Sequence, residues 1–263
     1  EYIWGLGFRQ SRDNITNSPV LFYDPTQQQT DLFSAFVQGE FLLQPVRLTV
    51  GSKFEHNSYT GWEIQPTLRA LWNLNAQHSF WAAVSRAVRT PSRSDEDGAS
   101  GTINSLLNLQ FIARGTHQFE SEILQAYELG YRFTPSKHLL LDTTAFVNHY
   151  DKLRNVGQVG FDFSSLPPTV ILEDNNKMYG EMYGLELALH WQVLESWKLI
   201  GTYSYLNVQL HLHDSIGSVI GETEEGDSPR NQASLRSLWT LPYKMELDSA
   251  WYYVDNVPNQ QTK

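Results

Sequence analysis

Polar and apolar side chains alternate along much of this chain with a period of two residues, not the 3.6 residues of a helix. The segment 179–192 reads YGEMYGLELALHWQ, and the apolar residues of one set are Tyr183, Leu185, Leu187, Leu189 and Trp191. A strand places such a set on one face, whereas a helix spreads it around its circumference. The same alternation in 47–56, 61–73 and 122–133 predicts further β-strands.

We expect eleven strands, many of ten or more residues, against ~5–6 residues for a strand of a soluble protein. Their predicted spans are 1–11, 31–44, 46–57, 61–73, 79–90, 121–134, 138–151, 178–193, 197–210, 231–241 and 245–255. Short connections at 44–45, 73–78, 134–137, 193–196 and 241–244 alternate with long polar ones at 12–30, 91–119, 152–177 and 211–230. Only the connection 57–60 departs from this order, because it is short although it lies at the end of the sheet where the other connections are long.

This layout is typical of an outer-membrane barrel, in which short periplasmic turns alternate with long extracellular loops. The strand length agrees with the ~9–11 residues that a tilted membrane strand needs. The predicted fold class is therefore all-β, an antiparallel up-and-down transmembrane β-barrel in contact with the lipid bilayer. A soluble β-sandwich is the alternative, but sandwich strands are short.

Aromatic residues favour the membrane location. The chain has eight Trp, 13 Tyr and 13 Phe, more than an acidic soluble domain needs. Several lie beside the short turns, where an aromatic girdle is expected at the membrane–water boundary. The expected girdle residues are Trp4, Trp72, Trp81, Phe133, Trp191, Trp197, Trp239 and Tyr243.

Composition excludes several other classes of protein. Mean hydropathy is −0.40, and no run approaches the ~18 unbroken apolar residues of a membrane helix. The absence of Cys excludes a disulfide scaffold and a thiolate zinc site, and the net charge of −10 argues against nucleic acid as a partner. No Walker, dinucleotide-binding, GxSxG or HExxH motif is present. We therefore assign no catalytic residue and no cofactor.

Five segments follow one another in a recognisable order and spacing along the chain. They are 81–93 (WAAVSRAVRTPSR), 120–132 (ESEILQAYELGYR), 141–153 (LDTTAFVNHYDKL), 183–206 (YGLELALHW followed by WKLIGTYSYL) and 228–242 (SPRNQASLRSLWTLP). In order and spacing they resemble the barrel of TonB-dependent outer-membrane receptors, and the resemblance runs across nearly the whole chain. It implies a barrel of about 22 strands plugged by an N-terminal globular domain. It also implies capture of a scarce ligand, such as an iron–siderophore complex or cobalamin, by the extracellular loops and the plug. The TonB complex would then energise uptake across the Gram-negative outer membrane through a segment near the receptor's N-terminus.

The sequence departs from that family pattern at both ends. It begins at Glu1 without a plug or a TonB-contacting segment, and it ends at Lys263 in a polar stretch rather than in an aromatic strand. Eleven strands are an odd number, and an open sheet in lipid leaves two unpaired edges. We therefore expect residues 1–263 to be a middle-to-late part of a single barrel domain, without the plug, the early strands and the last strands. Such a part should transport nothing by itself.

Candidate ligand-binding residues lie at the predicted outer mouth. The basic ones are Arg86, Arg89, Arg93, Arg114 and His117. A ferric siderophore complex is often anionic, and Arg offers forked, permanently charged donors. The alternative is that these side chains contact anionic lipid or the acidic runs 95–97 and 222–227.

Two further candidates are His211 and His213, which share one face of an extended segment, so both imidazoles could reach one metal ion. The alternative is an exposed loop with two unrelated His. No third metal ligand is fixed by the spacing, and no metal site is assigned. Charged residues on the polar strand faces, such as Arg132 and Glu186, are expected to pair across neighbouring strands or to contact a plug, and cross-strand pairing is favoured. The sequence thus predicts a section of a receptor for a metal chelate such as a ferric siderophore, with a passive porin-like channel or an outer-membrane barrel hydrolase as alternatives.

Overall fold

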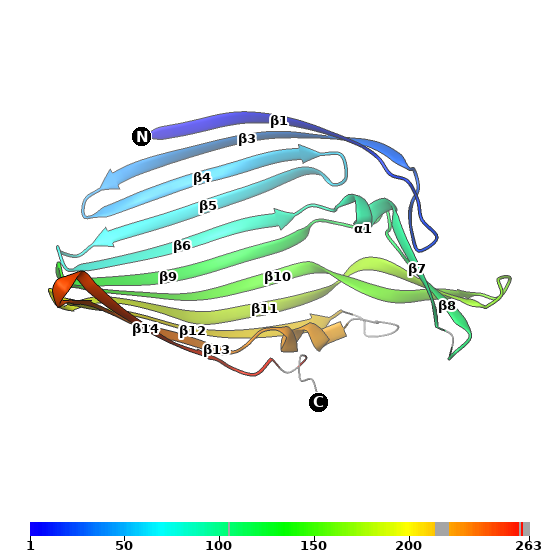
Figure 1. Cartoon of the computed structure of the whole chain (residues 1–263). Coiled ribbons are helices and arrows are strands. Elements are labelled where there is room, and N and C mark those ends of the chain that lie inside the picture. The colour runs from blue at the N-terminus through cyan, green and yellow to red at the C-terminus, as the bar shows by residue number, and fades with distance from the viewer. Residues whose placement is uncertain (105, 214–220, 258, 260–263) are drawn as a thin grey trace.

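Eleven long strands form one antiparallel sheet that curls into half of a barrel (Figure 1). The structure is a computed structural model, and it describes residues 1–104, 106–213, 221–257 and 259. The strands, in sheet order, are β1 (Tyr2–Asn14), β3 (Gln27–Leu43), β4 (Val46–Asn57), β5 (Gly61–Asn73), β6 (His78–Arg89), β9 (Glu122–Ser136), β10 (Leu139–Asp162), β11 (Thr169–Leu194), β12 (Trp197–Leu212), β13 (Asn231–Leu241) and β14 (Met245–Val254). Each of the eleven predicted strands corresponds to one of these, so the fold class is confirmed.

The long connections hold more regular structure than the sequence predicts. The remaining elements are β2 (Leu21–Tyr23), α1 (Arg93–Asp97), β7 (Gly98–Asn104), β8 (Leu109–Arg114) and the short 3-10 helices η1 (Gly221–Asp227) and η2 (Pro242–Lys244). The prediction of a loop over 152–177 was wrong, because β10 and β11 continue as a hairpin beyond the barrel. Lys152 has a positive φ of 57° and lies at a register shift, which hides the continuing strand from the alternation pattern. Of the connection 211–230, residues 214–220 lie outside the described residues.

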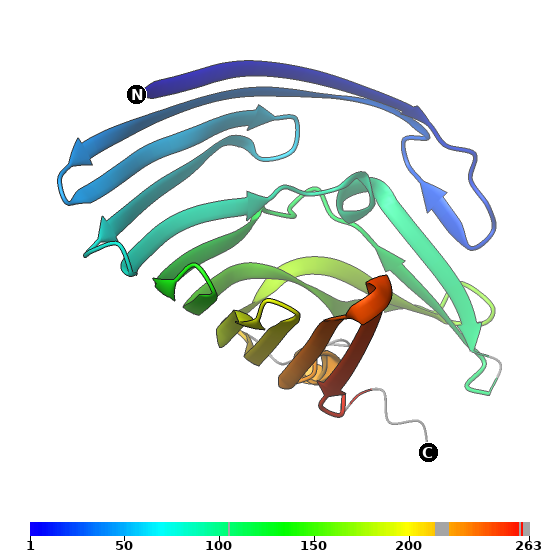
Figure 2. The ribbon, with the colours of Figure 1, turned by 60° about the vertical axis from the view of Figure 1, so that its left-hand side comes forward.

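Three of the long connections join at the long-loop end into one extension of the sheet (Figure 2). β8 pairs in parallel with the start of β11, β7 pairs with β8, and β2 pairs with β7. Segments about 60 to 80 residues apart in the sequence are therefore hydrogen-bonded in one sheet. This extension fixes where α1 and its neighbours stand relative to the barrel wall.

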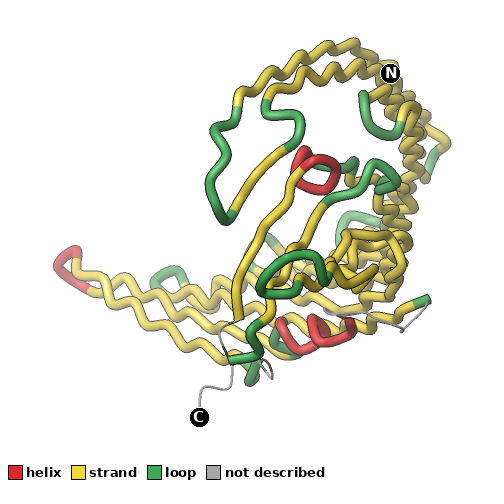
Figure 3. Tube along the Cα trace, turned by 90° about the vertical axis from the view of Figure 1, so that its right-hand side faces the viewer, coloured by secondary structure: helices red, strands yellow, loops and turns green. Residues whose placement is uncertain are grey.

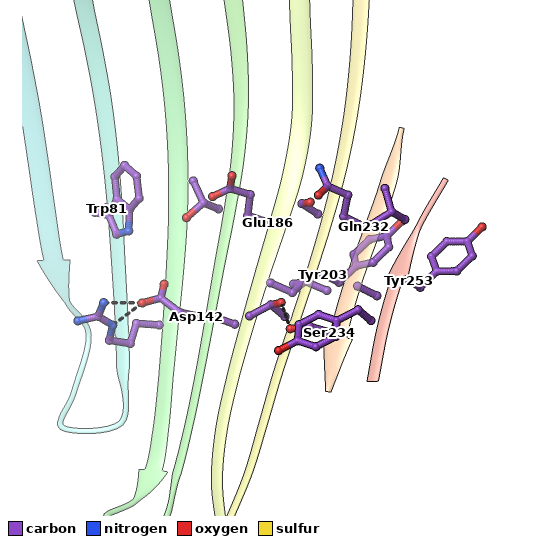
Figure 4. Close-up of a pocket in the computed structure, with 16 residues that line it drawn as sticks. Trp81, Asp142, Glu186, Tyr203, Gln232, Ser234 and Tyr253 are labelled. Carbon is purple, nitrogen blue, oxygen red and sulfur yellow. Dashed lines mark hydrogen bonds and ion pairs between the residues drawn. The ribbon is translucent and has the colours of Figure 1, made fainter. Parts of the chain in front are cut away.

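The two faces of the curled sheet differ in polarity. α1 lies inside the curl, on its concave side (Figure 3). Polar residues of the strands, such as Asp142 and Glu186, point to this side (Figure 4). The convex side carries apolar residues, and Leu6, Leu129 and Trp251 are each more than half exposed there. Because the sheet is one layer thick, only six apolar residues of the described part are buried: Ala83, Phe119, Val156, Val170, Met178 and Leu210. An exposed apolar face of this extent suits contact with lipid acyl chains.

Within the described part of the chain, no helix has the length and apolar character needed to cross a bilayer.

Aromatic rings gather on the convex face near the short turns. The rings of Trp72 and Phe80 are 5.8 Å apart, and the rings of Trp197 and Trp239 stack at 4.5 Å. The girdle prediction for Trp81 was wrong, because the register that places Trp72 opposite Phe80 turns Trp81 to the concave face. Its ring lies over Gly130, where an added Cβ would be only 2.0 Å away.

Candidate functional site

The chain between β6 and β7 builds a short acidic turn at the long-loop end. Pro91 has no N–H with which to continue the ladder of β6, and Ser92 then caps α1. The Ser92 hydroxyl accepts from the backbone N–H of Asp95 at 3.3 Å, while the Asp95 carboxylate accepts from the Ser92 N–H at 2.8 Å. This capping box buries three consecutive carboxylates, those of Asp95, Glu96 and Asp97.

Two arginines compensate the first of these carboxylates. Arg89 donates two hydrogen bonds to Glu122, at 2.7 and 2.8 Å, and one to Asp95 at 3.1 Å. Arg154 donates to both oxygens of Asp174 at about 3.0 Å, and its Nε lies 3.7 Å from Asp95. Burial by itself raises the pKa of Asp95, but the hydrogen bonds from Ser92 and Arg89 outweigh it and lower that pKa below its ordinary value.

Arg93 ties this turn to the first long connection. Its side chain is only 12% exposed; it pairs with Asp97 at 3.1 Å and contacts the carboxylate of Asp13 and the carbonyl of Pro25. Its guanidinium also lies 5.5 Å from the centre of the Tyr23 ring. One buried side chain therefore joins β1, the β2 segment and α1.

His117 closes the cluster from the segment that leads into β9. Its Nδ1 lies 3.0 Å from Glu96 and its Nε2 lies 3.6 Å from Oδ1 of Asp97, an oxygen with no hydrogen-bond partner in the described structure. Burial raises the pKa of Glu96, against the opposing effect of His117. The imidazole is 76% exposed and thus reaches both solvent and two buried carboxylates.

The sequence-predicted residues fall into three places. Arg89, Arg93 and His117 belong to the α1 cluster, and Arg114 pairs nearby with Glu173 at 2.9 Å. Arg86 lies apart, on β6, and its side chain reaches Ile64 of β5. Each of these five basic side chains lies within ion-pair distance of a carboxylate. Three of the carboxylates are those of Asp95, Glu96 and Asp97, the acidic run that the sequence analysis gave as the alternative to a ligand.

The two other candidates lie away from the α1 cluster. The rings of His211 and His213 flank Tyr179, at 5.3 and 4.5 Å between ring centres. His211 lies 3.9 Å from Glu222, and His213 lies 3.8 Å from Asp151. No group of three or more His, Asp or Glu side chains suited to a metal ion is found among the described residues.

Arg154 and Lys152 are site residues that the sequence analysis missed. Both fall in the segment predicted to be a loop, and no spacing in the sequence relates them to Asp95 or Glu120. Lys152 pairs with Glu120 at 2.7 Å. Only the pairing of the extended β10 and β11 brings them to the mouth.

The concave wall below the mouth holds a further hollow of about 710 Å³ (Figure 4). Arg132 donates to Asp142 at 2.9 Å, and the hydroxyls of Thr202 and Ser234 are 2.6 Å apart. Glu186 points into the same space. The pairing of Arg132 with Asp142 agrees with the prediction that the inward charges pair across strands.

The family model described as TonB dependent receptor-like, beta-barrel matches residues 1–262. An iron-regulated outer membrane virulence protein of Vibrio cholerae serotype O1 is 24% identical over 181 residues, which is 66% of this chain and 27% of that protein.

Solved structures share the fold. The siderophore receptor PirA from Acinetobacter baumannii superposes with a TM-score of 0.74 at 14% identity, covering 95% of this chain and 39% of that one. A variant of the ferric enterobactin receptor PfeA from Pseudomonas aeruginosa, in complex with enterobactin, gives 0.71 at 18% identity, covering 88% and 33%. The chain thus spans less than half the length of these relatives.

Proposed function

The chain belongs to the TonB-dependent receptor family as part of its β-barrel, and from this we propose that the receptor containing it imports an iron chelate. Its strands lie in the outer membrane of a Gram-negative bacterium. The family is one of transport receptors and not of enzymes, so we propose uptake rather than hydrolysis. Residues 1–263 are proposed to belong to a single barrel domain.

One observation carries the proposal: the family match runs across residues 1–262 and so includes the polar mouth around α1. In this family the extracellular loops and the plug capture the ligand. The names of the relatives support iron as the cargo, since one is iron-regulated and two are siderophore or ferric enterobactin receptors. The proposed partners are therefore a ferric siderophore or similar chelate and, through a region outside this chain, the TonB complex.

At the mouth we assign contact and support to different residues. The side chains of Arg89, Arg114 and His117 are 46%, 51% and 76% exposed, so each presents surface to solvent while it is paired. We propose that these three contact the chelate. Arg93 is too buried to do so and positions α1 instead. Ligand contact by Arg86, His211 and His213 stays a prediction.

Uptake measurements on the full-length receptor test this function. A strain that lacks its own chelate receptors would express the receptor and receive radio-iron as a ferric tris-hydroxamate, a ferric tris-catecholate or ferric citrate. We expect accumulation of at least one chelate, and we expect it to vanish when the TonB gene is deleted. Equal accumulation without TonB would instead identify a passive channel, and lack of accumulation of all three would contradict the proposal.

A further inference from the structure

The ladder between β5 and β6 stops part-way up the barrel wall. Pairing runs from Asn73 opposite Ser79 to Thr67 opposite Ser85, and above that point the two strands diverge. Pro66, the first residue above the last pair, has no N–H with which to continue a ladder. The guanidinium of Arg86 crosses the opening instead and donates to the carbonyl of Ile64 at 2.5 Å. Figure 1 shows the resulting gap between the ends of β5 and β6.

A cleft of about 330 Å³ occupies this opening. Thr60, in the turn before β5, meets Ser121, just before β9, with 3.0 Å between their hydroxyls, so the chain closes over the end of β6. Phe119 is 3% exposed, Ser121 is 6% exposed, and both line the cleft. The volume is that of a small-molecule site, and a hydroxyl with an aromatic ring beside it offers both polar and apolar contact.

Charges in the cleft cancel in pairs. The buried carboxylate of Glu63 accepts from the Thr60 hydroxyl at 2.9 Å and lies 3.8 Å from Arg86. At the entrance, Lys152 pairs with Glu120 at 2.7 Å. His117 also lines the cleft, and its Nδ1 lies 3.0 Å from Glu96. An ionised ligand group would therefore find no unpaired opposite charge among these residues, and its desolvation would be uncompensated. A neutral group with hydrogen-bond donors and acceptors meets no such cost.

We propose that this cleft in the barrel wall, which meets the α1 cluster at His117, receives an uncharged arm of the imported chelate that is rich in amide or hydroxyl groups. The proposal rests on the proposed function. It assigns to the cleft the recognition of the ligand's periphery, while the α1 cluster lies at the mouth. Gln118 lines the cleft with an exposed side chain, and its amide supplies one donor and one acceptor to such an arm.

The first test fills the cleft without disturbing buried groups. Gln118→Trp in the full-length receptor places a large ring at the entrance, and Ala76→Trp, in an exposed short turn at the other end of the barrel, is the matched control. Binding of the three ferric chelates used above is measured by quenching of intrinsic fluorescence on purified receptor. For each chelate that the wild type binds, we expect Gln118→Trp to weaken affinity at least tenfold and Ala76→Trp to change it less than twofold. Equal affinities of the two variants would overturn the proposal.

The second test concerns the charge of the arm. The double variant Lys152→Met with Glu120→Gln removes the entrance ion pair while keeping similar volumes. If the arm is neutral, we expect the affinity of the double variant to lie within threefold of that of the wild type at low and at high salt. A tenfold loss that depends on salt would show an ionised arm and overturn the assignment. Absence of binding of every chelate to the wild type would instead refute the proposed function, which separates the two failures.

Discussion

The substitution Arg93→Met tests whether a single buried cation holds two extracellular connections together. The Arg93 side chain is 12% exposed, and its partner Asp97 is 1% exposed, so the substitution leaves a buried carboxylate without its guanidinium partner and with His117, 3.6 Å away, beside it. Removing one partner of a buried ion pair costs about 3–5 kcal/mol. The second partner, Asp13, is 42% exposed and adds little, because exposed pairs contribute ~0–1 kcal/mol. We take about 3 kcal/mol, which is roughly a 100-fold change in a local opening equilibrium.

Hydrogen exchange on the full-length receptor measures this opening. The reporting amides are those of Asp24, which donates to Asp97 at 3.2 Å, and Gly101, which donates to Val20 at 2.9 Å. These bonds join the first connection to the end of α1 and to β7, and both amides should exchange about 100-fold faster in Arg93→Met. The matched control is Arg114→Met, because Arg114 is 51% exposed and its pair with Glu173 should change exchange less than fivefold. If the two variants accelerated exchange equally, the argument from burial would be refuted.

Three further predictions concern the wall and the acidic turn. Leu185→Lys on the convex face should lower the free energy of unfolding in liposomes, measured with urea, by about 2–4 kcal/mol, whereas Glu186→Gln on the concave face should lower it by less than about 1 kcal/mol. Comparable losses of unfolding free energy in the two variants would contradict the assignment of faces. Gly130→Ala should displace the ring of Trp81, shift its emission and lower stability by about 1–3 kcal/mol, while an unchanged spectrum and midpoint would disprove the contact. The pKa of Asp95 is lowered in the folded state, so the stability that its carboxylate contributes is present above the unfolded pKa and is lost as pH falls through the folded pKa. The pKa of Glu96 is raised in the folded state, so Glu96 takes up its proton at a higher pH than in the unfolded chain, and this uptake removes a buried charge. A spin label on the variant Ser94→Cys should therefore stay immobile from about pH 7 to about pH 5 and gain mobility only below about pH 4. A gain in mobility near pH 6 would contradict the lowered pKa of Asp95 as the cause of the pH dependence.

Much of the wall was predictable because the alternation within each strand shows which residues form its apolar face and which form its polar face. The segment 183–191 places Leu185, Leu187 and Leu189 on one side and Glu186 on the other without reference to any other part of the chain. The eleven spans and the short turns follow from that local alternation. The error at Trp81 shows its limit: nearness to a turn does not say which face a residue takes, and the pairing of Trp72 with Phe80 decided it.

The candidate site was only partly predictable. The sequence marked Arg89, Arg93 and His117 as a basic group, and it named the acidic run at 95–97 as an alternative partner. It gave no sign of Arg154, because the bulge at Lys152 interrupts the alternation and makes a strand resemble a loop. Nor does any spacing indicate that Thr60 and Ser121 close a cleft beside Pro66.

The sequence by itself determined the class of fold, the number of wall strands and the face that meets lipid, since these depend on periodicity and chain length that act within a few residues. Tertiary structure alone decided the joining of three connections through β2, β7, β8 and β11, the ion pairs that compensate each arginine, and the opening between β5 and β6. The joined connections and the cleft depend on pairings between residues about 60 to 80 positions apart, whereas the ion pairs span from 4 to 80 positions. Such pairings form where closing a long loop is offset by burial and hydrogen bonds on both partners, and neither partner carries that information alone.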